Sequence, residues 1–199
     1  MKSKYKGIVL AGGSGSRLSP LTSITSKQLL PVYDKPMIYY PISTLMLAGI
    51  REILLISDTV SLPLYQKLLG DGSQFGISIV YEVQLEPNGI AEAITIGSDF
   101  IGDSGFVLIL GDNLIYGDSL GERIANCFQE SDVATIFGYK VADPERFGVI
   151  ELGEDDNVVG LEEKPSLPKS RYAAIGLYIY PPEAVSIALL GPGVKNIVK

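Results

Sequence analysis

The sequence is poor in the side chains that most often carry acid–base and thiol chemistry. Its 199 residues include no histidine and a single cysteine, Cys127. The lack of histidine excludes from this chain a Ser-His-Asp triad, a thiolate–imidazole pair and any Cys/His zinc site. Cys127 lies among apolar residues at helical spacing, which is typical of a small core residue. The chemistry must therefore use carboxylates, lysine, arginine, backbone donors and a hard metal ion.

Long apolar runs are also missing. No uninterrupted run reaches the ~18 residues that a membrane-spanning helix needs. The N-terminal segment MKSKYKGIVLAGG has a basic start, but its apolar run is too short for the core of a signal peptide. We therefore expect a cytoplasmic protein without a membrane partner.

Positive charge is scarce relative to negative charge. The chain has 16 Lys and Arg against 23 Asp and Glu, which gives a net charge of −7. Because nonspecific nucleic-acid binding depends on neutralising phosphates, this balance argues against a nucleic-acid partner. With 46% hydrophobic and 20% charged residues, the composition is that of a folded globular chain.

Strand and helix patterns alternate along the first 141 residues. The strand patterns cover 8–11, 51–56, 78–83, 106–110 and 132–141, and the helical patterns cover 36–48, 61–69, 91–100 and 119–129. This alternation predicts an α/β fold with an open, mostly parallel, Rossmann-like sheet flanked by helices. Beyond residue 141 the pattern changes to a β-hairpin over 148–152 and 158–162, a strand over 173–180 and a short helix over 182–190.

A Gly-rich loop follows the first predicted strand directly. Gly12, Gly13 and Gly15 have no Cβ, so their backbone N–H groups can close around a phosphate or a base edge. Arg17 offers a planar fork for phosphate oxygens, and Lys27 offers a mobile point charge. The simpler interpretation is a tight turn followed by a solvated loop. The Gly spacing matches neither the Walker A motif nor the dinucleotide fingerprint, which disfavours an NAD-binding protein.

The length of this loop favours a functional role. Between Gly12 and Ser26 there is no period, and connections beyond about a dozen residues are usually functional or disordered. We expect an ordered loop that is anchored by its apolar side chains, namely Leu18, Pro20, Leu21 and Ile24.

Two further segments lie at strand ends, where ligands gather in α/β proteins. Asp112 ends the run FVLILGDN and either caps a turn or binds a divalent cation together with substrate phosphates; we favour the metal role. Gln84 can donate and accept in one plane, which suits the Watson–Crick edge of a pyrimidine, with Pro87 and Gly89 as a thin, rigid wall. Taken without their context, these segments have simpler interpretations. Pro-Asn-Gly at 87–89 is an ordinary turn sequence, and Glu163-Lys164 could be an ordinary surface ion pair.

The segment GGSGSRLSPLTSITSKQLLPVYDKPMIYYP resembles the opening signature of the sugar-phosphate nucleotidylyltransferases, most closely the glucose-1-phosphate thymidylyltransferases among them. The similarity continues through YEVQLEPNGIAEA, LGDNLIYG, DPERFGV, EEKP and GLYIY, so it covers nearly all of the chain to Tyr180. The resemblance implies a fold of the nucleotide-diphospho-sugar transferase type. Ser16 stands where the family usually has threonine, a change that keeps the hydroxyl.

The resemblance also implies roles for individual residues. On the nucleotide side, the residues around the triphosphate are Gly12, Gly13, Gly15, Ser16 and Arg17, and those at the base are Gln84, Pro87 and Gly89. Lys27 faces the reacting phosphates, and Asp112 is the ligand of Mg²⁺. The hexose and its phosphate are held by Gly148, Glu163, Lys164 and Ala174. Arg17, Lys27, Asp112 and Lys164 are the expected catalytic residues. We therefore expect one domain, with a nucleotide-binding core over 1–141 and a sugar-phosphate-binding portion over 142–199.

The sequence departs from the family pattern in two places. The family strand Ala-Val-Thr-Gly-Leu-Tyr is replaced by Ala-Ala-Ile-Gly-Leu-Tyr over 173–178, so that one hydroxyl on the sugar side is lost. Family members also continue beyond the position of Lys199, through a Glu-Ile-Thr-Asp-type segment that supplies a second metal carboxylate. The resemblance therefore implies that the 142–199 portion is incomplete, either by truncation or in a shortened relative with impaired catalysis.

The implied activity is Mg²⁺-dependent nucleotidyl transfer from dTTP to glucose-1-phosphate, giving dTDP-glucose and pyrophosphate for nucleotide-sugar and polysaccharide biosynthesis. Two alternatives stay open. One is a uridylyltransferase that uses UTP, because Gln84 suits either pyrimidine. The other is a nucleotide- and sugar-phosphate-binding module without turnover. We also expect a homo-oligomer.

Overall fold

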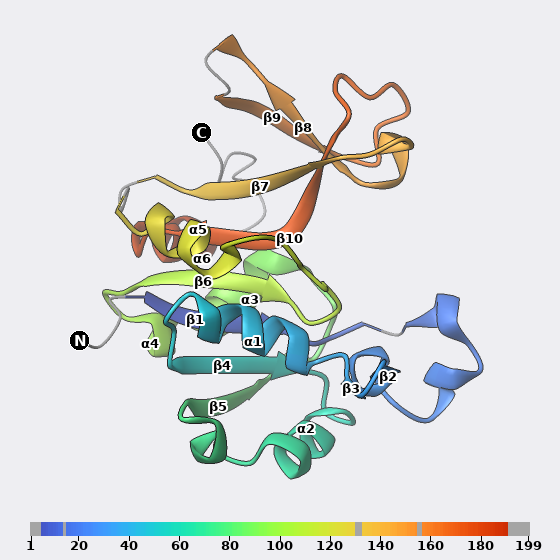
Figure 1. Cartoon of the computed structure of the whole chain (residues 1–199), viewed down its shortest axis with the longest axis vertical. Coiled ribbons are helices and arrows are strands. Elements are labelled where there is room, and N and C mark those ends of the chain that lie inside the picture. The colour runs from blue at the N-terminus through green and yellow to red at the C-terminus, as the bar shows by residue number, and fades with distance from the viewer. Residues whose placement is uncertain (1–4, 14, 130–132, 155–156, 191–199) are drawn as a thin grey trace.

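An eight-stranded sheet forms the centre of the computed structural model, which describes residues 5–13, 15–129, 133–154 and 157–190 (Figure 1). Its strands are β1 (Tyr5–Leu10), β4 (Glu52–Ser57), β5 (Ser78–Val83), β6 (Gly105–Leu110), β7 (Thr135–Lys140), β8 (Gly148–Leu152), β9 (Val158–Glu163) and β10 (Tyr172–Tyr180). They lie in the order β5-β4-β1-β6-β10-β8-β9, and β7 pairs with β10 beside this path. None of the helices in the described part of the chain is long and apolar enough to cross a membrane.

The sheet has a parallel half and a mixed half. Strands β5, β4, β1 and β6 are parallel neighbours, and β10 runs antiparallel to β6. Because β7 and β8 in turn run antiparallel to β10, they share the direction of the parallel half. The predicted fold class, a mostly parallel α/β sheet, is therefore confirmed. The predicted strand over 132–141 is β7, and its first residue lies outside the described residues.

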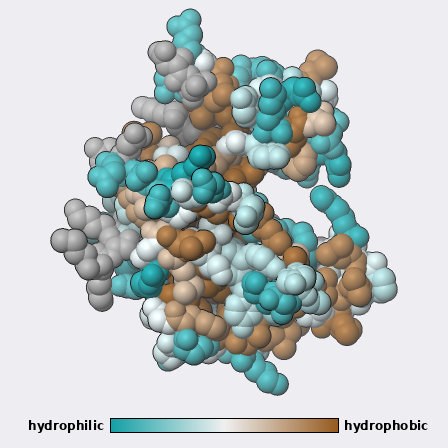
Figure 2. Space-filling view, viewed as in Figure 1, coloured by the Kyte–Doolittle hydropathy of each residue, from teal (hydrophilic) through white to brown (hydrophobic). Residues whose placement is uncertain are grey.

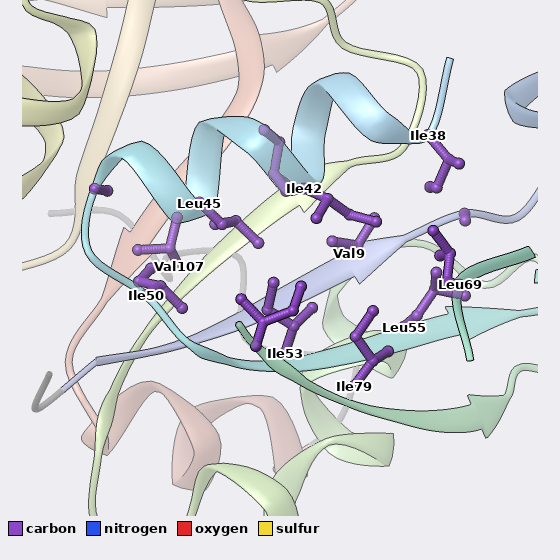
Figure 3. Close-up of a cluster of buried hydrophobic side chains, with 14 of the residues drawn as sticks. Val9, Ile38, Ile42, Leu45, Ile50, Ile53, Leu55, Leu69, Ile79 and Val107 are labelled. Atoms are coloured by element: carbon purple, nitrogen blue, oxygen red, sulfur yellow. The ribbon is translucent and has the colours of Figure 1, made fainter. Parts of the chain in front are cut away.

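Helices cover both faces of the parallel half (Figure 1). They are α1 (Tyr39–Leu47), α2 (Leu62–Leu69), α3 (Ile90–Ile96), α4 (Ser98–Ile101), α5 (Leu120–Cys127) and α6 (Glu183–Leu189). Successive strand residues point to opposite faces. Val9 and Leu55 pack with α1 and α2, as Figure 3 shows, whereas Ile8 and Leu54 pack with α3. All four side chains are fully buried, which is why these strands read as continuous apolar runs.

Two predicted helices have different bounds in the structure. The helix expected over 36–48 begins at Tyr39, because Pro31–Val32 (β2) and Lys35–Pro36 (β3) first form a two-stranded hairpin. The helix expected over 91–100 is divided at Gly97, which ends α3 and precedes α4. A Cβ at Gly97 would lie 3.1 Å from both Ile8 and Leu54, so this glycine allows the chain to approach the sheet closely.

The loop after β1 contains three short 3₁₀-helices, at Ser16–Leu18, Leu21–Ser23 and Lys27–Leu29. The expectation that apolar side chains anchor it is wrong, because Leu21 is 62% exposed and Ile24 is 92% exposed. Polar contacts hold the loop instead. The Thr22 hydroxyl, for example, donates to the carbonyl of Gly15 at 2.9 Å.

The hairpin of β8 and β9 forms an arm at one end of the molecule (Figure 1). Strand β10 connects this arm to the core. Its C-terminal half, Leu177–Tyr180, pairs with β6, whereas Ala173 pairs with both β7 and β8, and the β7 register shifts between Ala174 and Tyr178. The sheet thus continues from the parallel core into the arm.

Candidate active site

Two adjoining cavities lie at the carboxyl edge of the parallel strands. The larger, of about 660 Å³, includes Gly12, Gly13, Gln84 and Pro87 in its lining. The smaller, of about 380 Å³, is lined by Gly12, Gly13, Gly15, Ser16, Arg17, Leu18, Lys27, Gln28 and Asp112. Gly12 and Gly13 belong to both linings. The structure therefore brings together the segments after β1, β5 and β6, as the parallel order of these strands requires.

The Gly-rich loop adopts backbone conformations that favour glycine. Gly13 has φ +106° and Gly15 has φ +56°, both in the left-handed region. A Cβ at Gly15 would also lie only 2.8 Å from Cγ2 of Thr22. A side chain at Gly15 would therefore strain the loop and displace Thr22, which holds it closed.

Asp112 and Lys27 form an ion pair in the smaller cavity. Lys27 Nζ lies 2.8 Å from Asp112 Oδ2, and the two side chains are 32% and 35% exposed. The other carboxylate oxygen accepts from Asn113 Nδ2 at 3.1 Å, and Asn113 Oδ1 accepts from the backbone N–H of Gly176 in β10 at 3.0 Å. The carboxylate is therefore oriented by a side chain that is itself tied to the neighbouring strand.

Asp112 fits one coordination position of Mg²⁺, because it is a hard oxygen ligand beside a cavity. Among the residues that the structure describes, no group of three or more His, Cys, Asp or Glu could hold a metal ion. Asp112 is the carboxylate that the described lining of the smaller cavity offers to such an ion.

Gln84 forms part of the wall of the larger cavity. Its side chain is buried, and its backbone N–H donates to the carbonyl of Ser57 at 2.9 Å. The side-chain nitrogen Nε2 donates to the carbonyl of Gly89 at 3.3 Å and to Glu92 Oε2 at 2.5 Å. Gln84 is thus held in one place at the end of β5, with the predicted base-binding residue Gly89 beside it.

The four predicted sugar-side residues lie in and beside the arm, with Gly148 and Glu163 in the hairpin, Lys164 directly after β9 and Ala174 in β10. Gly148 pairs with Glu163 across the hairpin, and a Cβ on Gly148 would lie 4.0 Å from Cβ of Ala174. Lys164 Nζ lies 3.4 Å from Glu163 Oε1, and both side chains are largely exposed. Figure 2 shows the surface hollowed between the arm and the loop that follows β1. The end of β9 thus carries a carboxylate, Glu163, which is followed directly by a cation, Lys164, and both are exposed.

The chain matches the family model described as nucleotidyl transferase over residues 6–193. The chain belongs to the nucleotidyl transferase family. It is 55% identical to a glucose-1-phosphate thymidylyltransferase of Neisseria gonorrhoeae over 183 residues, which are 92% of this chain and 64% of that protein. A glucose-1-phosphate thymidylyltransferase of Mycobacterium tuberculosis is 51% identical over 92% of this chain and 63% of its own length. The chain thus spans slightly less than two thirds of the length of these relatives.

Solved structures of related proteins have the same fold as this chain. A protein from Bacillus anthracis, provisionally assigned as a glucose-1-phosphate thymidylyltransferase and solved with sucrose, superposes with a TM-score of 0.88 at 39% identity. The match covers 98% of this chain and 79% of that one. A UDP-glucose pyrophosphorylase complexed with UDP-glucose superposes with a TM-score of 0.79 at 26% identity, over 100% of this chain and 83% of that one. The nucleotide-diphospho-sugar transferase fold implied by the sequence is therefore confirmed.

The sequence analysis missed a buried polar network behind the Gly-rich loop of this family member. Gln28 is 3% exposed, and its Nε2 donates to the carbonyl of Gly12 at 3.1 Å. The hydroxyl of Ser26 donates to Gln28 Oε1 at 2.5 Å and lies 2.7 Å from the phenol oxygen of Tyr65. Burial raises the pKa of Tyr65 to about 12, so the phenol keeps its proton for these contacts. The network ties the Gly loop to α2.

A signal for this network was present in the sequence. Gln28 follows Lys27 and precedes two leucines, and a glutamine next to such an apolar pair has to be hydrogen-bonded if it is buried. Its partners Ser26 and Tyr65 are 39 residues apart in the chain, and only the packing of α2 against the loop brings them together.

Proposed function

We propose that this chain catalyses nucleotidyl transfer from dTTP to glucose-1-phosphate, giving dTDP-glucose and pyrophosphate. The observation that carries the proposal is the pair of adjoining cavities, one with Gln84 in its wall and the other with Arg17 and the Lys27–Asp112 pair. The identity of about 50% to proteins named glucose-1-phosphate thymidylyltransferase supports dTTP and glucose-1-phosphate as substrates. The likeness to UDP-glucose pyrophosphorylase supports UTP as the alternative nucleotide.

The size and lining of the two cavities favour one placement of the nucleotide. The base would occupy the larger cavity against Gln84, and the triphosphate would occupy the smaller one. There the backbone of the Gly loop and the side chains of Arg17 and Lys27 would neutralise phosphate charge. Glucose-1-phosphate would enter through the hollow beside the arm and meet Lys164 and Glu163.

The proposed reaction needs no covalent intermediate with the protein. An oxygen of the sugar phosphate attacks the α-phosphorus, the bond from that phosphorus to the β-phosphate oxygen breaks, and pyrophosphate leaves. The nucleophile is already ionised at neutral pH, so no general base is needed, which fits a chain without histidine. Arg17, Lys27 and Lys164 would position the phosphates and neutralise their charge. Mg²⁺ held by Asp112 and the triphosphate would supply further charge neutralisation.

Replacing Gln84 with alanine should weaken binding of dTTP and leave glucose-1-phosphate binding unchanged. The change removes the side chain that faces the base, and the loss of one or two hydrogen bonds implies about 1 to 3 kcal/mol. Calorimetric titration of each ligand measures both effects, and Gln66→Ala on the exposed surface of α2 is the matched control. A selective loss of sugar-phosphate binding would mean that the two halves of the site have been exchanged.

Replacing Lys164 with methionine should have the opposite selectivity. Methionine keeps most of the aliphatic stem and removes the charge, so the affinity for glucose-1-phosphate should fall while the affinity for dTTP is retained. Lys169→Met is the matched control, because Lys169 lies in the same connection between β9 and β10, is similarly exposed and pairs with Glu151 at 2.8 Å. Losing an ordinary surface ion pair changes stability by no more than ~1 kcal/mol. Equal effects of the two substitutions would show that Lys164 has no special role.

A further inference from the structure

The amide of Gln84 has a fixed orientation because of its contact with Glu92. Glu92 lies in the first turn of α3, and its Oε2 is 2.5 Å from Nε2 of Gln84. An ionised carboxylate can only accept hydrogen bonds, so the –NH₂ group of Gln84 must face Glu92. The carbonyl of Gly89, another acceptor, takes the same nitrogen at 3.3 Å. Both N–H groups of Gln84 are therefore engaged on the protein side.

The contacts of Glu92 keep this arrangement rigid. Its second oxygen, Oε1, accepts from Nδ2 of Asn88 at 3.2 Å. Gln84 is only 6% exposed, so water cannot readily replace a contact that the amide would lose by turning over. The carboxylate is therefore held from one side by Asn88 and binds Gln84 on the other.

The carbonyl oxygen of Gln84 consequently faces the cavity. Oε1 lies 3.7 Å from the point where a Cβ of Gly12 would stand, and Gly12 and Gln84 line the same cavity. Gln84 thus offers an acceptor, and not a donor, to a molecule bound between the Gly loop and the end of β5.

We propose that Glu92 is a positioning residue that sets the base specificity of the site by holding Gln84 as an acceptor. This inference rests on the proposed function, in which a pyrimidine occupies the larger cavity. Thymine and uracil carry an N–H at position 3 and can donate to Oε1 of Gln84. Cytosine has an unprotonated nitrogen there, so two acceptors would face each other. The site should therefore select thymine and uracil against cytosine.

Glu92→Gln tests the inference at constant side-chain size. A glutamine at this position can present either its oxygen or its nitrogen to Gln84, so the amide is no longer restricted to one orientation. The preference for dTTP over dCTP, measured as a ratio of dissociation constants by calorimetry, should fall about tenfold, the equivalent of one hydrogen bond. The preference of dTTP over dUTP should not change, because both bases carry the same N–H.

Two further variants separate positioning from a general structural effect. Glu86→Gln removes the same charge from an exposed residue of the neighbouring loop and should leave all three affinities unchanged. The exchange Gln84→Glu with Glu92→Gln restores an acceptor toward the base and a donor from position 92, so the dTTP preference should return. A thermal unfolding curve, recorded for each variant, checks that the variant is folded.

The outcomes distinguish this inference from the proposed function. A wild-type chain that prefers dTTP, together with an unchanged dTTP/dCTP ratio in folded Glu92→Gln, would overturn the inference alone. Equal weakening of all three nucleotides in that variant would do the same, because it would indicate a structural role. A wild-type chain that binds none of the three nucleotides would overturn the proposed function and this inference with it.

Discussion

Asp112→Asn should lower Mg²⁺-dependent release of pyrophosphate at least about 10²- to 10³-fold, because it removes the carboxylate that holds the metal against the phosphates. Asparagine has nearly the same volume, and its side-chain oxygen can still accept from Asn113 Nδ2, so the fold should be retained. A coupled assay of pyrophosphate release with dTTP and glucose-1-phosphate measures the first effect. Thermal unfolding measures the second.

The matched control is Asp118→Asn, an exposed carboxylate on the same connection between β6 and α5. It changes the net charge equally and should leave turnover unchanged. Full activity of Asp112→Asn would contradict the assignment of Asp112 as the metal ligand.

Lys27→Met should change two measurements in opposite directions. Turnover should fall about 10²- to 10³-fold, because a cation that faces the reacting phosphates is lost. Binding of Mg²⁺ to the nucleotide-free protein should increase, because Asp112 loses the ammonium group that lies 2.8 Å from it and becomes available to another cation. Calorimetric titration with Mg²⁺, with and without dTTP, follows the second effect.

Lys67→Met, on the exposed side of α2, is the control for the loss of one positive charge. In the wild-type protein and in this control, Mg²⁺ should bind detectably only when nucleotide is present, since phosphate oxygens supply most of its ligands. Tight binding of Mg²⁺ to the nucleotide-free wild-type protein would contradict the account and would require a second carboxylate near Asp112.

The parallel core could be predicted from the sequence because its strands are buried on both faces. Short continuous apolar runs, such as those of β4 and β6, are typical of strands in a parallel sheet that is covered on both faces. Their order then places Gly12, Gln84 and Asp112 at one edge of the sheet. The meeting of these three segments follows from topology alone, so no knowledge of side-chain contacts was needed.

Features that depend on packing between distant segments could not be predicted. The apolar residues of the Gly loop suggested anchors, but the loop is held by Thr22 and by the network of Gln28. The pattern over 91–100 gave one helix, because nothing local shows that Gly97 must approach Ile8. Strand β10 pairs with β6 and β8, which are distant in sequence, and the hydrophobic periodicity of a strand does not show which strands it pairs with.

Within the site, the sequence identified residue types but not their orientation. The sequence shows only that Gln84 can both donate and accept hydrogen bonds, and the Pro-Asn-Gly that follows it at 87–89 could be an ordinary turn. The contact with Glu92, eight residues later, turns this general amide into an acceptor that faces the cavity. Such information resides in the side-chain geometry, which a single sequence does not contain.

The most direct test is release of pyrophosphate from dTTP in the presence of glucose-1-phosphate and Mg²⁺, with dTTP binding measured on the same preparation. The account predicts that dTTP binds and that pyrophosphate and dTDP-glucose appear in equal amounts. Release should require both substrates and the metal, and Asp112→Asn should lower it at least about 10²- to 10³-fold. Binding of dTTP without release would contradict nucleotidyl transfer by this chain and would identify it as a nucleotide-binding module.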